Sequence, residues 1–116
     1  MKLVHIIFSP EAEESYKRLN ELAADSKIER SILNSIEKKK DLIKSNPHYG
    51  EPIAKDKIPE EYKEKYGIHN LFWVELSNFW RMLYTLTNDD TEIEIIAFIM
   101  DIVDHNKYNK KFGYKK

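Results

Sequence analysis

One arginine lies within the most aromatic stretch of the sequence. Arg81 follows Phe79 and Trp80 in the segment FWRMLY, which has the composition of a β-strand. A charge among apolar side chains must find an anionic partner or lie at the sheet edge, because an unpaired buried charge is costly. The partner can be a carboxylate, with Glu75 as the cross-strand candidate, or a phosphate, which the planar guanidinium binds through parallel N–H groups. Arg81 is therefore predicted to be either half of an ion pair or a phosphate ligand.

The C-terminal tail combines basic and aromatic residues. Between His105 and Lys116 there are five lysines and no acidic residue. This mixture suits RNA, because aromatic rings stack on bases while lysines hold phosphates. The candidate RNA contacts in the tail are Tyr108, Tyr114, Lys107, Lys110 and Lys111. Alternatively, Tyr108 and Phe112, which are four residues apart, form the packing face of a terminal helix.

His105 follows Asp104, where the last apolar run of the chain ends. Side chains at strand ends beside loops are often catalytic, and a histidine exchanges protons near neutral pH, so His105 is a candidate general acid or base. The plainer alternative is a surface histidine without a chemical role. The four histidines are scattered and lack metal-site spacing, so no metal ligand is predicted.

Two further lysines lie in a long connection, residues 48–69, that is punctuated by proline and glycine. Loops of this length are uncommon in small domains and often have a function. Lys55 and Lys57 are two residues apart, so both side chains point to one side if this segment is extended. Residues 59–66 can hold a short helical turn that begins at Pro59.

Two helices are predicted before this connection. Ser9 can cap the first helix with Pro10 at its first position. Ser26 and Glu29 have the spacing of a capping box for the second helix, which Pro47 ends. The two helices follow each other closely and are expected to form an αα-hairpin.

Four segments have the composition of β-strands: residues 3–8, 71–76, 79–87 and 93–103. Short polar turns join the last three, which predicts a three-stranded antiparallel meander. The last segment is apolar on both faces, so this strand is expected to be central and covered on each side. The order predicts one α+β domain over residues 1–116, with an N-terminal strand, an αα-hairpin, the meander and a short basic C-terminal segment.

The charge of the chain is nearly balanced, with 19 Lys+Arg, 20 Asp+Glu and a formal net charge of -1. This balance argues against a protein held on nucleic acid or on a membrane by bulk charge, so any basic surface must be local. The absence of cysteine excludes disulfides, thiolate metal sites and a thiol nucleophile. No phosphate-binding or dinucleotide motif is present, and no run is long enough for a membrane span or a signal peptide. A cytoplasmic protein without a cofactor is expected.

The order of these elements, with "WRMLY" in the middle strand of the meander and "DHNKYNKKFGY" at the end, resembles the RelE/ParE superfamily. Members of this superfamily are toxin components of type II toxin-antitoxin modules, and the two motifs look like the RelE-like branch. The resemblance implies a small α+β ribonuclease that cuts mRNA in the ribosomal A site without a metal. It also implies a cognate antitoxin that wraps the sheet and covers the basic surface.

The resemblance also assigns roles to particular residues. The 2′-hydroxyl of the RNA attacks the adjacent phosphate, so the protein must remove a proton, stabilise the phosphorane and protonate the leaving oxygen. By position, Arg81 would contact the phosphate in the transition state and His105 would be the general acid or base. Lys55 and Lys57 would stabilise charge or act as base. The tyrosine for base stacking or proton transfer would be Tyr108 or Tyr114.

Two other functions fit the same sequence. One is a ParE-like inhibitor that arrests DNA gyrase by contact, in which His105 would be dispensable. The other is a non-catalytic RNA-binding relative, whose expression would be harmless to a cell. A fold does not determine a function, so the sequence leaves these alternatives open.

Overall fold

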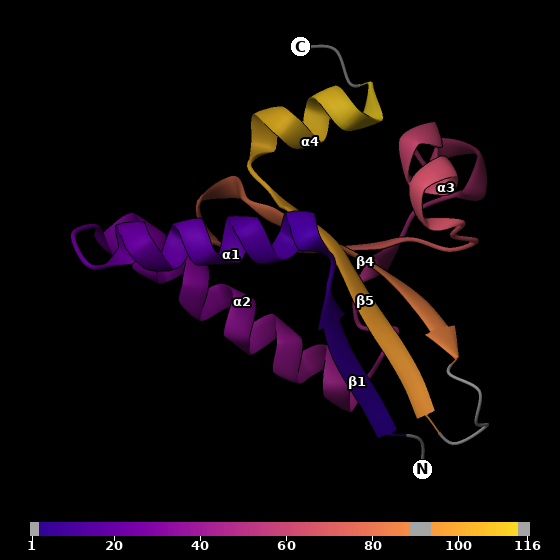
Figure 1. Ribbon diagram of the computed structural model, residues 1–116, viewed down its shortest axis with the longest axis horizontal. Coiled ribbons are helices and arrows are strands. Elements are labelled where there is room, and N and C mark those ends of the chain that lie inside the picture. Colours follow the sequence, from indigo (N-terminus) through magenta and orange to yellow (C-terminus); the bar gives the residue numbers. More distant parts are fainter. Residues whose placement is uncertain (1–2, 89–93, 114–116) are drawn as a thin grey trace.

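A five-stranded mixed sheet runs through the middle of the protein (Figure 1). The computed structural model describes residues 3–88 and 94–113. The strands have the spatial order β1-β5-β4-β3-β2, and their bounds are β1 Leu3–Phe8, β2 Glu51–Pro52, β3 Phe72–Glu75, β4 Arg81–Asn88 and β5 Glu94–Val103. The predicted α+β class is confirmed. The predicted three-stranded meander is smaller than the sheet, because β1 adds in parallel to β5 and the short β2 adds to β3.

The helical hairpin consists of α1 (Pro10–Ala23) and α2 (Lys27–Ser45). The predicted start of α1 is confirmed, since Ser9 Oγ accepts a hydrogen bond of 3.0 Å from the backbone N–H of Ala12. The same hydroxyl donates to the carbonyl of Met100 at 2.6 Å, so the cap also fastens α1 to β5. At α2, Ser26 donates to the Glu29 carboxylate, and neither side chain bonds a backbone N–H of the first turn, so the predicted capping box is not formed.

Each face of the sheet has its own hydrophobic core. The hairpin covers one face, where the buried Ile32, Ile36 and Ile43 of α2 share a core with Met82, Tyr84 and Ile99 of the sheet. The other face is covered by α3 (Glu60–Tyr66) and α4 (His105–Phe112), which contribute Tyr62 and Tyr108 to a second core. Burial of each large apolar side chain stabilises the fold by about 1.5–3 kcal/mol. The prediction that β5 is central and covered on both sides is confirmed, since it lies between β1 and β4 and contributes to both cores.

The long connection between α2 and β3 is more ordered than its composition indicates. It contains β2, a 3-10 turn at Lys55–Lys57 and α3, which confirms the helical turn predicted after Pro59. The hydroxyl of Tyr84 ties the connection to the sheet, because it donates to the carbonyl of Pro47 at 2.7 Å and accepts from the N–H of Gly50 at 2.9 Å.

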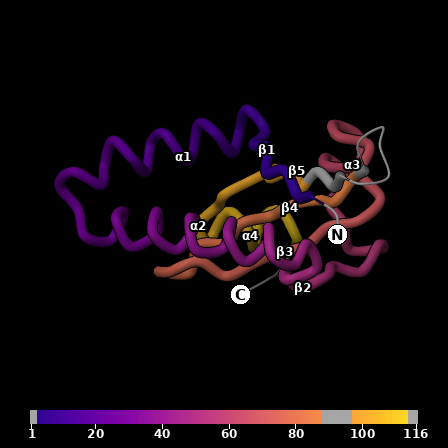
Figure 2. Tube along the Cα trace, turned by 90° about the horizontal axis from the view of Figure 1, so that it is seen from below, coloured from indigo at the N-terminus to yellow at the C-terminus, as the bar shows by residue number. Residues whose placement is uncertain are grey.

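The start of the first strand and the last helix lie at opposite ends of the sheet. In Figure 1, β1 begins at the bottom of the sheet, whereas α4 lies beyond the opposite end of the strands. Figure 2 shows α1 and α2 side by side, with the loop that joins them at the far left, beyond the sheet. Within residues 3–88 and 94–113, no helix combines the length and the apolar character that a membrane crossing requires.

Candidate functional site

The side chain of Arg81 lies between two aromatic rings. Its guanidinium carbon is 4.3 Å from the centre of the Trp73 ring and 4.3 Å from the centre of the Tyr108 ring. Sheet register explains the first contact, since Trp73 pairs with Leu83 and both lie on the same sheet face as Arg81. The second contact arises from α4, which carries Tyr108 onto that face. The rings hold the guanidinium through its flat faces, so its N–H edge remains the part that can bind an anion.

Arg81 does not form the cross-strand ion pair that was one of its two predicted environments. Glu75 is its register partner on β3, but no carboxylate in the described part of the chain lies within ion-pairing distance of Arg81. An arginine that is half-buried and stacked, with no described carboxylate within 4 Å, favours the second prediction, a phosphate ligand.

Tyr108 is held inside the second core. Its side chain is only 2% exposed, and its ring stacks on Phe112 with centres 4.4 Å apart and an interplanar angle of 20°. This is the i, i+4 packing face that the sequence offered as an alternative. A ring covered by Arg81 and Phe112 has little surface left for a nucleobase, so its contribution is to position Arg81.

His105 is the first residue of α4 and is exposed. Asp104 caps this helix by accepting a hydrogen bond of 2.9 Å from the N–H of Lys107. His105 lies one helical turn before Tyr108, so both occupy the same side of α4. The amide nitrogen of Asn109 is 3.1 Å from Nε2 of His105. When the ring is neutral and accepts this hydrogen bond, its proton is on Nδ1.

Two aromatic residues of this region were not recognised as site residues in the sequence. Trp73 stacks on Arg81, and the ring of Phe79 lies 6.2 Å from that of His105. The alternation of side chains between the two faces of a strand could have indicated that Trp73 lies on the same face of the sheet as Arg81. Phe79 is 73% exposed and has a φ of 64°. No pattern in the sequence predicts a phenylalanine in the left-handed backbone conformation. The structure therefore brings Arg81, His105 and Tyr108 to one end of the sheet together with Trp73 and Phe79.

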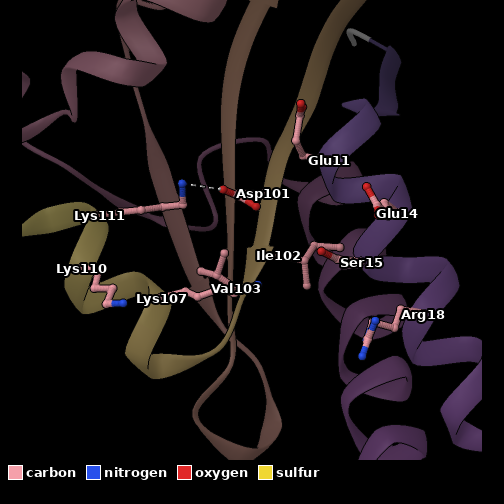
Figure 3. Close-up of a pocket in the computed structure, with 10 residues that line it drawn as sticks. All are labelled: Glu11, Glu14, Ser15, Arg18, Asp101, Ile102, Val103, Lys107, Lys110 and Lys111. Atoms are coloured by element: carbon pink, nitrogen blue, oxygen red, sulfur yellow. Dashed lines mark ion pairs between the residues drawn. The ribbon is translucent and has the colours of Figure 1, made fainter.

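The lysines of α4 lie along the cleft between α4 and α1, and Lys111 also reaches α3. Lys107, Lys110 and Lys111 line a cleft of about 780 Å³ that Arg18 also borders. Figure 3 shows α4 on one side of the cleft and α1 on the other, with residues 101–103 of β5 between them. Within the described residues, Lys107, Lys110 and Arg18 have no acidic partner within 4 Å. Glu11, Glu14 and Asp101 also line the cleft, so its charge is mixed, and Lys107, Lys110 and Arg18 are the cations there that can attract an anionic strand.

Lys111 is neutralised by two carboxylates. Its Nζ is 3.2 Å from Glu61 and 3.5 Å from Asp101, so the charge is less available to RNA than the sequence indicated. Asp101 also accepts a hydrogen bond of 2.9 Å from the Tyr62 hydroxyl. Burial, and then the negative charge of Asp101, raise the pKa of Tyr62 far above its ordinary value. Tyr62 therefore remains a hydrogen-bond donor, and the network of these four residues fastens α3 and α4 to β5.

The remaining predicted RNA contacts are exposed or lie outside the described residues. Lys55 and Lys57 are exposed on a 3-10 turn, so the extended geometry that would point both to one side is not adopted. Lys57 borders a cleft of about 470 Å³ together with Lys110 and Lys111, whereas Lys55 does not line it. Tyr114 lies outside the described residues.

In residues 3–88 and 94–113, no three histidine, aspartate or glutamate side chains gather closely enough to hold a metal ion. No family model matches the sequence, and no curated protein matches it significantly. Any function must therefore be argued from the residues of the site.

Proposed function

We propose that this chain is a ribonuclease toxin of the RelE-like kind, which cleaves mRNA on the ribosome. The observation that carries the proposal is the environment of Arg81. Its guanidinium is stacked between Trp73 and Tyr108, and no acidic side chain of the described chain neutralises it. A preorganised cation without a partner suits the charge that develops on a phosphate during strand cleavage.

The chemistry follows from the groups at this end of the sheet. The 2′-oxygen of the RNA forms a bond to the adjacent phosphorus as its proton is removed, and the bond from phosphorus to the 5′-oxygen breaks as that oxygen gains a proton. The RNA supplies the nucleophile, and the products are a 2′,3′-cyclic phosphate and a 5′-hydroxyl. Arg81 stabilises the added negative charge on the phosphorane. His105 transfers one of the two protons, and solvent water exchanges the other.

The other residues of the site either hold Arg81 in position or attract the RNA. Trp73 and Tyr108 hold Arg81 in place and act as positioning residues. Lys107 and Lys110, which have no acidic partner in the part of the chain that the structure describes, draw the RNA backbone toward α4. Lys55 and Lys57 contribute positive charge from the exposed turn before α3.

The net charge of the protein indicates which partners it needs. With a formal net charge of -1, the protein has little general attraction for RNA, so we expect the ribosome to present the mRNA. The exposed His105 and Phe79 leave this end of the sheet open to a protein that would block the site. A cognate antitoxin that covers Arg81 would keep the nuclease inactive in the cell.

The test is inducible expression in a bacterial host, with growth curves and transcript-end mapping. The parent should arrest growth and cut inside translated codons, whereas Arg81→Ala and His105→Ala should lose at least 100-fold of the cleavage, a loss expected for transition-state and proton-transfer groups. Lys38→Ala is the matched control, because this exposed lysine lies on α2, which covers the opposite face of the sheet.

Two results would overturn the proposal. A folded Arg81→Ala protein that cuts transcripts as well as the parent would remove Arg81 from the reaction. Growth arrest with DNA damage and without transcript cuts would instead favour the gyrase inhibitor. Circular dichroism of each purified variant would establish that it is folded.

A further inference from the structure

The side chain of Phe79 is the most exposed large hydrophobic group among the described residues. It is 73% exposed, although its neighbours in sequence, Trp80 and Arg81, are both half-buried. An apolar ring in this position contributes little to the core. Burial therefore does not explain why a phenylalanine occupies position 79.

The backbone conformation of Phe79 is also unfavourable for this residue type. Asn78 and Phe79 both have positive φ, at 56° and 64°. Asparagine tolerates the left-handed region, but a residue with a bulky ring does so only under strain. Glycine would adopt the same conformation freely. Position 79 thus combines an exposed apolar ring with backbone strain, a combination that indicates a role outside folding stability.

Hydrogen bonds fix the loop that carries this ring. The N–H of Leu76 donates to the carbonyl of Trp80 at 2.8 Å, which closes the loop on itself. The N–H of Ser77 donates to Ser35 Oγ at 3.2 Å, which fastens the loop to α2. The backbone that carries the Phe79 ring is therefore already ordered, so little conformational entropy is lost when a ligand binds the ring.

The neighbours of Phe79 indicate which ligand suits it. Its ring centre is 6.2 Å from that of His105, and the planes are tilted by 57°. Arg81 follows two residues later, and its guanidinium has no acidic partner within residues 3–88 and 94–113. A flat aromatic surface beside a cation and an imidazole matches a nucleotide, in which a base and a phosphate are joined through a sugar.

We propose that Phe79 is a stacking platform for one nucleobase of the RNA strand whose phosphate Arg81 contacts. This inference rests on the proposed function for the identity of the phosphate, and it adds a base-binding residue. Stacking of this kind accepts every base but favours those with large rings, so Phe79 influences which codons are cut.

The first experiment measures binding of a short single-stranded RNA that carries 2′-O-methyl groups and one 2-aminopurine base. Such an RNA cannot be cleaved, and the fluorescence of 2-aminopurine changes on stacking. Phe79→Gly should weaken binding roughly 5- to 150-fold, which is the usual effect of removing one stacked ring. Phe79→Trp should bind at least as tightly as the parent. Ile28→Ala is the control, because Ile28 is 56% exposed on α2.

The second experiment separates stacking from a structural role. Because Phe79→Gly relieves the left-handed strain, this variant should melt a few degrees above the parent while it binds RNA more weakly. A lower melting temperature would show that the ring supports the fold and would overturn the proposal. Equal RNA affinity of Phe79→Gly and the parent would overturn it too, as would the absence of a stacking signal for the parent with both free RNA and RNA-programmed ribosomes.

The two proposals can fail separately. If Arg81→Ala and His105→Ala cleave normally, the assigned chemistry is wrong, but the 2-aminopurine signal still reports on Phe79. If Phe79→Gly binds RNA normally while Arg81→Ala loses cleavage, the nuclease stands and the stacking platform is rejected.

Discussion

The guanidinium carbon of Arg81 lies 4.3 Å from the centre of the Tyr108 ring, and this contact joins β4 to the C-terminal helix α4. Trp73 on β3 lies at the same distance from the guanidinium. A cation–π contact of this kind stabilises by about 0.5–2 kcal/mol, depending on how far it is removed from water. The site is therefore complete only when α4 is packed on the sheet.

Trp73 should affect the rate of cleavage because it holds Arg81 in position, without contacting RNA itself. We expect Trp73→Phe, which keeps a ring beside the guanidinium, to retain activity within a few-fold of the parent. Trp73→Leu removes the stacking partner and should lower single-turnover cleavage about 10-fold or more, since small misplacement of a catalytic group is costly. Adding Trp73→Leu to Arg81→Ala should cause no further loss, and an additional loss of similar size would contradict the positioning role.

Tyr62→Phe should destabilise the fold by about 1–3 kcal/mol, because it leaves the Asp101 carboxylate with one hydrogen-bond donor fewer in a partly buried site. Since the pKa of Tyr62 is strongly raised, the hydroxyl is a donor throughout the neutral range and the loss should not vary between pH 6 and 9. Urea denaturation measures the change. Tyr49→Phe is the control, because Tyr49 is exposed and, among the described residues, its hydroxyl bonds only Lys39. An equal loss in both variants would contradict the network.

Glu11 should make the stability depend on pH in the acidic range. Hydrogen bonds from Lys65 and then Tyr66 lower the pKa of Glu11 to about 2, from its ordinary value of 4.5. A carboxyl whose pKa is lower in the folded state stabilises the protein above its unfolded value, and this contribution is lost as the pH falls through the folded value. The Glu11 contribution is therefore present at pH 7 and lost between about pH 4.5 and 2.

The measurement compares the urea midpoints of Glu11→Gln and the parent at several pH values. The parent should have a slightly higher midpoint at pH 7, and the two should converge near pH 2. The difference should be small and should shrink in high salt, since Glu11 is 44% exposed and water screens the pair. Glu14→Gln, one turn later on α1 and without an ion pair among the described residues, is the control. A constant gap between Glu11→Gln and the parent would contradict the assignment.

Several helices and strands could be predicted because the residues that specify them are close together in the sequence. Ser9 and Pro10 predict the start of α1, and the cap is formed by groups only three residues apart. The apolar pattern of residues 93–103 predicts a strand covered on both faces, and Tyr108 and Phe112 pack at helical spacing. The first residue of that predicted strand, Ile93, lies outside the described residues.

Other expectations failed or were incomplete because they depend on distant partners. Lys111 was expected to contact RNA, but Glu61 from α3 and Asp101 from β5 neutralise it. Lys55 and Lys57 were considered on an extended segment, but backbone hydrogen bonds of a 3-10 turn determine their directions. The parallel pairing of β1 with β5 joins the two ends of the chain, and no pattern within either strand specifies its partner.

The sequence by itself determined the α+β class, the helical hairpin and the candidates Arg81 and His105, because composition, capping and periodicity act within a few residues. Only the tertiary structure decided what surrounds those candidates. Sheet register brings Trp73 beside Arg81, the packing of α4 brings Tyr108 to its other side, and a strained turn exposes Phe79 next to His105. These contacts join residues far apart in the chain, and they form because each face of the sheet must be covered by a hydrophobic core.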